Sequence, residues 1–355
     1  MPRFHPSSDP LRILVTGGSG FLGAHIVARL LEEGFSVGVF SRQPKHVSVG
    51  EDYMRRLSYH AGDVNNRARV TEVISDFKPH AIVHAAAPHH TAPAVQHQQA
   101  TVEGTRILLD CASNCPETRA FIYTSSDSAI VPTQTPLSEE NAELYTASHY
   151  PNTYACAKAL ADGTTLAANS TALATAVLRV PVLYGEYDNN FIPQLLKSIR
   201  NNERKLQIGS NEKLFEFLYV KKAAEAHVLA VRALLDQTTA SGVAGEAFFV
   251  SDGRPELFFD FSRRCYAAAG SPVSADQVMI IPLAALQAAA SIGEWLYWMF
   301  TLGFVQPKLR RHSIDHLDRG CCWNIDKAKQ KLGYEPIVDQ DGAIRRTMKW
   351  AMVNL

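Results

Sequence analysis

A glycine-rich turn constrains the fold of this 355-residue chain more than any other stretch, Gly17-Gly18-Ser19-Gly20-Phe21-Leu22-Gly23. It follows an apolar run, residues 11–15, and precedes a helix-like run, residues 24–31. Glycine at 17 permits a tight turn, at 20 it lets a pyrophosphate approach the backbone, and at 23 it lets the helix pack closely. A helix that begins there offers unpaired N–H groups to phosphates. An ordinary turn also uses glycine, but the strand and helix around it favour a dinucleotide site.

Strand-like and helix-like segments alternate through the first half of the chain. We expect strands at 11–16, 35–40, 58–63, 81–84, 120–124 and 175–180, and helices at 24–33, 67–77, 101–111 and 154–168. In the second half we expect a helix at 191–200, short strands at 215–220 and 246–250, and a helix at 221–235 between them. This alternation predicts an α/β fold with a Rossmann-type, doubly wound parallel sheet. Right-handed crossovers bring the carboxyl ends of such strands to one edge of the sheet, where ligands bind.

Composition excludes several functional classes. The 35 basic and 35 acidic residues balance, so we expect no nucleic-acid partner. Six scattered cysteines show no C-x-x-C spacing, so we expect no metal site and no disulfide framework. The adjacent His89 and His90 cannot easily aim at one ion, and we interpret them as loop or substrate-pocket residues. Residues 1–10 have no apolar core of a secretory signal, which favours a cytoplasmic location.

The end of the second expected strand bears on the cofactor. An acidic residue about 20 positions after the glycine turn would bind the ribose 2′-OH of NAD, but Ser41 and Arg42 stand there. A hydroxyl beside a guanidinium would accept a 2′-phosphate, so we favour NADP, with NAD as the alternative. Arg42 can also be a solvated turn residue with Lys45 simply nearby. Asp63 is placed to accept a hydrogen bond from the adenine amino group, or else caps its own loop.

Two later sequence motifs predict a catalytic site. Ser126 ends a strand-like run, 123–126, and Tyr154 is followed four residues later by Lys158 on the same helix face. No other tyrosine of the chain has a lysine four positions on. A chance exposed pair is the alternative, but the order of glycine turn, strand-end serine and Tyr-x-x-x-Lys favours a site.

The chemistry requires these residue types. A phenol has a pKa near ~10, and a nearby ammonium and a positive nicotinamide would lower it. Tyr154 could then donate or accept the proton when a carbonyl and an alcohol interconvert, a contribution of roughly 10²–10⁴-fold. Ser126 would orient the reacting oxygen, and Lys158 would also hold the nicotinamide ribose.

These motifs resemble the extended short-chain dehydrogenase/reductase superfamily and, more narrowly, the 3β-hydroxysteroid dehydrogenase family with its sterol 4-carboxylate 3-dehydrogenases. The resemblance covers nearly the whole chain. Besides the residues above it rests on the stretches 84–87 (HAAA), 102–105 (VEGT), 121–126 (FIYTSS), 178–185 (LRVPVLYG), 217–221 (FLYVK), 307–309 (PKL) and 327–336 (KAKQKLGYEP).

The resemblance implies roles for the matching residues. Ser126, Tyr154 and Lys158 match the catalytic triad, with Ser125 as the fallback for the serine. The cofactor-binding positions it implies, together with those argued above, are Gly17, Gly20, Phe21, Leu22, Gly23, Ser41, Arg42, Asp63, Val64, Ala85, Ala86, Tyr154, Lys158, Pro181, Val182 and Leu183. Two positions depart from the family: Thr101 replaces a usual asparagine, and Ser41 replaces an aspartate common in NAD-using members.

The resemblance also implies a division of the chain. We expect an NAD(P)-binding Rossmann domain at 1–185, completed by parts of 215–250, and a mainly helical, smaller substrate-binding region at 186–355. The stretch 278–304 is nearly uncharged and rich in alanine and aromatic residues. We interpret it as a lid over an apolar pocket, with an interfacial membrane helix, a membrane span and plain core packing as alternatives. Contact with the endoplasmic reticulum membrane and a homodimer are further expectations.

We therefore expect an NAD(P)-dependent oxidoreductase that interconverts a secondary alcohol and a ketone on a lipophilic, multi-ring substrate such as a sterol, steroid or terpenoid. If that substrate carried a carboxylate beside the new ketone, the resemblance implies that decarboxylation would follow without extra residues. The alternatives are a reductase of flavonoids or aldehydes and, more weakly, a nucleotide-sugar epimerase. A non-catalytic NADP-binding sensor is the alternative of another class, but it would normally lack Tyr154 or Lys158.

Overall fold

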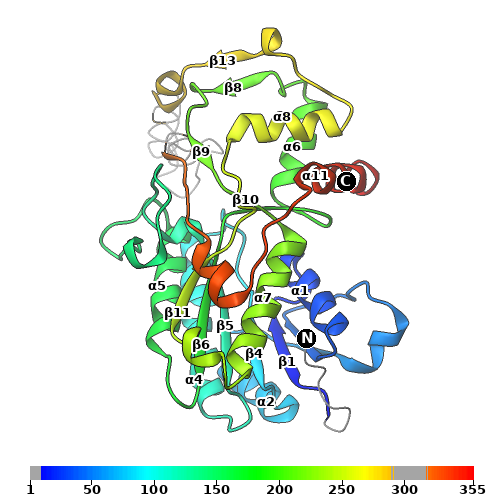
Figure 1. The fold of residues 1–355 in the computed structure, drawn as a ribbon, viewed down its shortest axis with the longest axis vertical. Coiled ribbons are helices and arrows are strands. Elements are labelled where there is room, and N and C mark those ends of the chain that lie inside the picture. Colours follow the sequence, from blue (N-terminus) through cyan, green and yellow to red (C-terminus); the bar gives the residue numbers. More distant parts are fainter. Residues whose placement is uncertain (1–8, 289–290, 292–316, 318) are drawn as a thin grey trace.

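The computed structural model describes residues 9–288, 291, 317 and 319–355. Within these ranges the core is a seven-stranded sheet in the order β11-β6-β5-β4-β1-β2-β3, and every neighbouring pair is parallel (Figure 1). Its strands are β1 (Arg12–Thr16), β2 (Ser36–Ser41), β3 (Leu57–Ala61), β4 (Ala81–His84), β5 (Ala120–Ser126), β6 (Ala174–Val180) and β11 (Glu246–Phe249). The predicted doubly wound α/β fold is confirmed.

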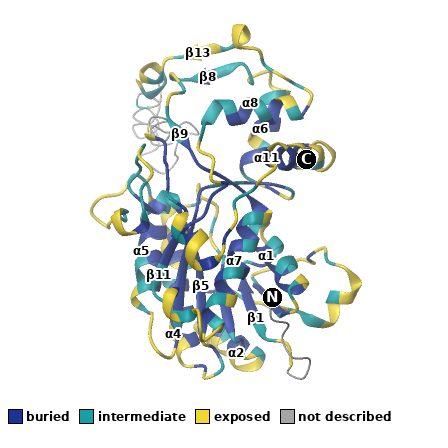
Figure 2. Ribbon diagram, viewed as in Figure 1, coloured by how far each residue is buried: buried dark blue, intermediate teal, exposed yellow. Residues whose placement is uncertain are grey.

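Helices cover both faces of this sheet. They are α1 (Phe21–Glu32), α2 (Arg67–Phe77), α3 (Ala94–Gln96), α4 (Gly104–Ser113), α5 (Thr153–Ala167) and α7 (Val220–Leu235). Alternate residues of β1 explain the two layers: Ile13 and Val15 pack in the core under α1 and α7, whereas Leu14 packs in the core under α2 and α4. Figure 2 shows the strands of this sheet buried along most of their length, except the edge strand β3.

The helix predicted at 101–111 differs from the structure. A π-helical segment, His97–Glu103, comes first and runs directly into α4 at Gly104. The π-helical turn, which is wider than an α-helical turn, therefore includes Thr101, the position where the family usually has asparagine. Shorter one-turn segments are η1 (Glu51–Arg56), η3 (Asp127–Ala129), η4 (Glu139–Asn141), η5 (Ala240–Gly242), η6 (Ala275–Gln277) and the π-turn η7 (Ala328–Leu332).

A second lobe stands beyond the carboxyl edge of the sheet (Figure 1). It contains α6 (Phe191–Arg200), α8 (Phe258–Ala268), α11 (Gln340–Asn354) and the short strands β7 (Val182–Tyr184), β8 (Leu206–Ile208), β9 (Leu214–Phe215), β10 (Phe217–Tyr219), β12 (Glu256–Leu257) and β13 (Met279–Ile281). Its core is aromatic, and the rings of Phe217 and Phe261 stack with centroids 3.7 Å apart. Most of the expected lid, 278–304, lies outside the described residues.

Residues 319–325, which we call the C-terminal strap, return from the second lobe to the sheet. The Cys321 N–H donates to the Leu214 carbonyl at 2.8 Å, and the Cys322 N–H donates to the Thr133 carbonyl at 2.9 Å. Trp323 forms a parallel bridge with Leu137 and stacks on Phe249 with ring centroids 4.4 Å apart. Because these three strap residues are buried, the strap is part of the core.

A buried ion pair ties α5 to β6 behind the carboxyl edge. The Arg179 guanidinium donates to both carboxylate oxygens of Asp162, each at 3.0 Å. The Asp162 side chain is fully buried and that of Arg179 is 4 % exposed. The bidentate hydrogen bonds offset the free-energy cost of removing both charges from water, provided that both partners are present.

Across the described ranges, no helix is both long and apolar enough to cross a bilayer.

We expect Asp162→Asn to lower the free energy of unfolding by about 3–5 kcal/mol, because it leaves the Arg179 charge buried without a counter-charge. Asp110→Asn is the matched control, since Asp110 pairs with Arg67 on the surface, and it should cost under ~1 kcal/mol. Chemical denaturation followed by circular dichroism measures both. Equal losses in the two variants would contradict this account of the ion pair.

Candidate active site

The glycine turn has the geometry that its sequence predicts. Gly17 leaves β1 with φ +71°, and its N–H donates to the Phe40 carbonyl at 2.9 Å. A Cβ on Gly23 would lie 2.1 Å from the Gly17 carbonyl oxygen, so only glycine lets α1 begin this close to the strand. No acidic residue stands in the first turn of α1. The free N–H groups of this turn can therefore receive an anion.

A cleft of about 770 Å³ opens along this turn, between the carboxyl ends of β1, β2 and β4. Strand order reverses between β1 and β4, which is where doubly wound sheets bind dinucleotides. Eleven predicted cofactor positions line the cleft: Gly17, Gly20, Phe21, Leu22, Gly23, Ser41, Arg42, Asp63, Val64, Ala85 and Ala86. Tyr154, Lys158, Pro181, Val182 and Leu183 lie outside its lining.

The ribose end of the cleft combines a hydroxyl with two cations. Ser41 Oγ is buried and has no hydrogen-bond partner within the described structure, and Arg42 and Lys45 line the cleft beside it. Ser19 holds Lys45 there, because its Oγ accepts from the Lys45 N–H at 2.9 Å. Asp63 caps its own loop by accepting from the Asn65 N–H at 3.0 Å, and it faces the cleft as well. These residues fit a dinucleotide.

The three predicted catalytic residues meet at the carboxyl end of β5. Ser126 is the last residue of that strand, and its hydroxyl lies close enough to the phenol of Tyr154 on α5 to lower the pKa of that phenol. Lys158 lies one turn further along α5, and its Nζ donates to the Thr124 carbonyl at 2.7 Å. Side chains alternate along a strand, so Ser125, the fallback, points to the other face. Its Oγ is buried and has no partner within the described structure.

Burial changes how these groups titrate. It lowers the pKa of Lys158 to about 8, although the nearby Asp162 carboxylate acts in the opposite direction. Burial also raises the pKa of Tyr154, the hydrogen bond with Ser126 lowers it, and the charge of Asp127 raises it further. The expected lowering of the Tyr154 pKa therefore does not come from the protein groups alone. Two cations were expected to lower the Tyr154 pKa, the Lys158 ammonium and the positive nicotinamide, and the nicotinamide is the one that remains for this role.

Two histidine rings pack against the phenol of Tyr154. The ring of His97 packs edge-on against the ring of Tyr154 with centroids 5.6 Å apart, and His90 does so at 6.5 Å. His89 lines the cofactor cleft and hydrogen-bonds Asn190 at 3.1 Å. The interpretation of His89 and His90 as loop residues beside the site agrees with this placement. No group of three or more metal-ligating side chains gathers among the described residues.

A buried hydrogen-bond chain fixes the strands around the site. Thr16 Oγ1 and His84 Nδ1 lie 2.6 Å apart, and His84 Nε2 lies 3.1 Å from Thr105 Oγ1 on α4. Burial and the nearby Lys158 charge lower the pKa of His84 to about 3, so its imidazole is neutral. Thr101, in the π-helical segment, is buried, and its Oγ1 has no partner in the described structure.

Some residues of the site were not predicted from the sequence. Lys45, Gln96 and Gln99 line the cleft, and His97 contacts Tyr154. Lys45 carried a weak signal because it follows Arg42 closely, but its tether to Ser19 is a tertiary contact. The helix α3, which ends at Gln96, and the π-helical segment that follows it with His97 and Gln99 carried none.

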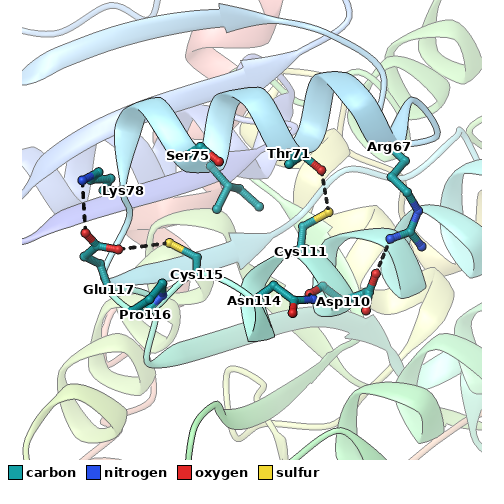
Figure 3. A pocket seen from close by; sticks show the side chains of 11 residues that line it. Arg67, Thr71, Ser75, Lys78, Asp110, Cys111, Asn114, Cys115, Pro116 and Glu117 are labelled. Carbon is teal, nitrogen blue, oxygen red and sulfur yellow. Dashed lines mark hydrogen bonds and ion pairs between the residues drawn. The ribbon is translucent and has the colours of Figure 1, made fainter.

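A second cavity, of about 490 Å³, lies on the outside of the sheet between α2 and α4 (Figure 3). The Lys78–Glu117 ion pair, 3.3 Å long, closes one end, and Arg67 with Asp110 closes the other. Thr71 Oγ1 and Cys111 Sγ lie 3.4 Å apart between them. None of the predicted site residues lines this cavity, so we assign the site to the cleft at the glycine turn.

The glycine cradle at the switch point and the Ser-Tyr-Lys group beside it define an NAD(P)-dependent short-chain dehydrogenase/reductase. Within that class, the chain belongs to the 3-beta hydroxysteroid dehydrogenase/isomerase family, whose sequence model matches residues 14–281. The predicted family and enzyme class are confirmed.

Relatives of known activity are similar over most of the chain. A decarboxylating sterol-4-alpha-carboxylate 3-dehydrogenase of Gibberella zeae is 55% identical over 287 residues, 80% of this chain and 95% of the relative. The enzyme of that description from Saccharomyces cerevisiae is 31% identical over 356 residues, 95% of this chain and 97% of the relative.

Among solved structures, UDP-glucose 4-epimerase from Thermotoga maritima has a TM-score of 0.71 at 20% identity, covering 97% of this chain and 99% of its own. The epimerase of Thermus thermophilus, solved with NAD, has a TM-score of 0.67 at 18% identity, covering 97% and 100%. At these identities the likeness shows the fold alone.

Replacing Gly23 by alanine should weaken cofactor binding by roughly 5- to 150-fold, because the added Cβ pushes α1 away from the turn and such overpacking costs ~1–3 kcal/mol. Gly242→Ala is the control, since no atom lies within 4 Å of its added Cβ. Fluorescence titration with the reduced cofactors measures both affinities. Wild-type affinity in Gly23→Ala would contradict the cradle.

Proposed function

We propose that this enzyme oxidises the 3β-hydroxyl of a sterol that carries a carboxylate on the neighbouring carbon. The observation that carries the proposal is the meeting of Ser126, Tyr154 and Lys158 at the end of β5, beside the dinucleotide cleft. The substrate class follows the relatives, whose descriptions name sterol-4-alpha-carboxylates. The likeness to sugar-nucleotide epimerases extends only to the fold and does not favour a sugar substrate.

The residues divide the reaction as follows. Ser126 hydrogen-bonds the reacting oxygen and fixes its position beside the Tyr154 phenol. Tyr154 accepts the hydroxyl proton as the base, and in the reverse direction it returns that proton as the acid. NAD(P)⁺ held in the cleft at the glycine turn would supply the hydride acceptor for the carbinol carbon. The product is a β-keto acid, which can lose its carboxyl group as CO₂ without a further residue.

Lys158 serves two purposes in this proposal. Below about pH 8 it is mostly an ammonium, so it adds positive charge to the Tyr154 helix face and can donate hydrogen bonds to the ribose of the nicotinamide. Its bond to the Thr124 carbonyl holds it next to β5 without neutralising it. At higher pH this charge is lost.

Imidazoles beside Tyr154 suit an acidic substrate. The rings of His89 and His90 lie with centroids 4.2 Å apart and planes tilted by 39°, and His90 contacts the Tyr154 ring. An imidazole N–H can donate to a carboxylate, and the substrate carboxylate lies one carbon from the reacting alcohol. This chemistry separates the proposed substrate from a neutral flavonoid or aldehyde.

We further propose the division of labour between the lobes. Residues 1–185, completed by parts of 215–250, hold the cofactor; β11 and α7 support this because both pack in the central sheet layer. Residues 186–355 bind the sterol, with 278–304 as a lid that can also contact a membrane surface. A homodimer and association with the endoplasmic reticulum membrane complete this proposal.

For the cofactor we propose a preference for NADP. Ser41 offers a hydroxyl where a carboxylate would repel the 2′-phosphate, and Arg42 and Lys45 supply positive charge at the same end of the cleft. Among the described residues lining the cleft, Asp63 alone is acidic.

The function is tested with a 3β-hydroxy-4α-carboxysterol, a neutral 3β-hydroxysterol, a flavonoid and a UDP-sugar, each with both oxidised cofactors. We expect turnover and CO₂ release with the carboxysterol. Tyr154→Phe should lower kcat by roughly 10²–10⁴-fold, because it removes the proton acceptor, while cofactor binding is retained. Tyr150→Phe, an exposed tyrosine outside the site, is the control. Near-full activity of Tyr154→Phe would rule out this proton acceptor.

Arg42→Ala should weaken NADPH binding about tenfold or more and leave NADH binding nearly unchanged, because only NADPH carries the 2′-phosphate. Arg55→Ala removes another exposed arginine, outside the cleft, and should change neither affinity. Equilibrium fluorescence titrations give all four values. Equal binding of the two cofactors by the wild-type enzyme would overturn the NADP preference.

A further inference from the structure

Asp127 follows Ser126 directly and begins the short turn η3. Its two carboxylate oxygens face different parts of the molecule. Oδ1 accepts a hydrogen bond from the Ser126 hydroxyl at 3.3 Å. Oδ2 accepts from the Cys321 thiol at 3.3 Å and from the Trp323 indole N–H at 3.5 Å. One carboxylate thus joins the strand-end serine to the C-terminal strap, almost 200 residues away in the sequence.

The strap side of this contact is rigid. Cys321 and Trp323 are each 5 % exposed, and the strap is hydrogen-bonded to Leu214 and Thr133 as described above. The Trp323 ring is stacked on Phe249 at an interplanar angle of 8°. Donors held this firmly restrict the position of the carboxylate that they contact.

We propose that Asp127 is a positioning residue for the reaction, holding the Ser126 hydroxyl with one oxygen and the C-terminal strap with the other. The strap thereby completes the catalytic end of β5. This inference rests on the proposed roles of Ser126 and Tyr154.

A chemical consequence follows from the single proton of Ser126. That proton can go to Asp127 or toward the Tyr154 oxygen and the substrate, so the carboxylate governs which way the hydroxyl points. The donors from Cys321 and Trp323 reduce the pull of the carboxylate on that proton. Asp127 thus sets both the orientation of Ser126 and the local negative charge that Tyr154 experiences.

The titratable groups around Asp127 come from several elements. Tyr154 and Lys158 stand on α5, Glu216 lies between β9 and β10, and Cys321 lies on the strap. Burial raises the pKa of Glu216 to about 7, so Glu216 can also titrate near neutral pH. The test must therefore separate Asp127 from Glu216.

The decisive measurement is the pH dependence of kcat for carboxysterol oxidation. Asp127→Asn keeps the shape of the side chain but removes its charge. The acid limb, set by Tyr154 as the base, should then move to lower pH by about one to three units, the range expected for one charge at close range. The plateau kcat should fall about tenfold, because the one amide oxygen is drawn to the strap donors and the amide NH2, which cannot accept, then faces Ser126. KM should stay within about twofold of wild type.

Trp323→Phe provides a second variant with the opposite sign. It preserves stacking on Phe249 but removes the indole N–H, so the carboxylate is less neutralised and the acid limb should move to higher pH. Trp350→Phe makes the same chemical change on α11 and should leave the limb and kcat unchanged. Glu216→Gln should not reproduce the loss of plateau kcat.

Opposite displacements of the limb in Asp127→Asn and Trp323→Phe support the inference. The inference is overturned if the acid limb of the pH profile does not move in either variant, or if kcat is unchanged in Asp127→Asn. It is also overturned if Glu216→Gln loses plateau kcat tenfold. Wild-type turnover and Tyr154→Phe are measured in parallel. If the wild type oxidises none of the alcohols, the proposed function fails; if only the Asp127 and Trp323 results fail, this inference alone fails.

Discussion

The parallel pairing of β1 with β2 on one side and β4 on the other is the constraint on which the rest of the structure depends. In this register Thr16 is paired with Phe40 and with His84, so three strands end together. A cleft opens there because the connections leave the two sides of β1 in opposite directions. The glycine turn then brings the start of α1 to the cleft, and the close contact between Gly17 and Gly23 allows no side chain between helix and strand.

Burial is what makes the group of Tyr154 and Lys158 at the end of β5 chemically unusual. Lys158 is almost completely buried, and its pKa falls to about 8 because water no longer solvates the ammonium. The Asp162–Arg179 ion pair lies behind it and counteracts part of that effect. Tyr154 is influenced in the opposite direction, since burial and Asp127 both favour the neutral phenol. In the protein alone Tyr154 therefore keeps its proton, and a bound cationic ligand would be needed to lower its pKa.

Local sequence patterns predicted most of the sheet domain. The strand 81–84 and the helices 67–77 and 191–200 agree with the structure residue for residue, because their apolar periodicity matches their burial. The prediction was wrong where tertiary contacts decide. A single strand was expected at 215–220, yet the chain forms two short strands separated by Glu216. The Glu216 carboxylate is buried and accepts hydrogen bonds from Ser251 and from the Trp323 N–H, partners that strand periodicity cannot reveal.

The sequence by itself determined the glycine turn, the order of the strands along the chain, the Tyr154–Lys158 spacing and the serine at the end of β5, because each depends on neighbours within a few residues. Only the tertiary structure decided which groups surround them. His97 reaches Tyr154 through a π-helical turn, Lys45 reaches the cleft through Ser19, and the strap reaches Asp127 from the far end of the chain. Such contacts arise from packing between distant segments, and no local periodicity encodes them.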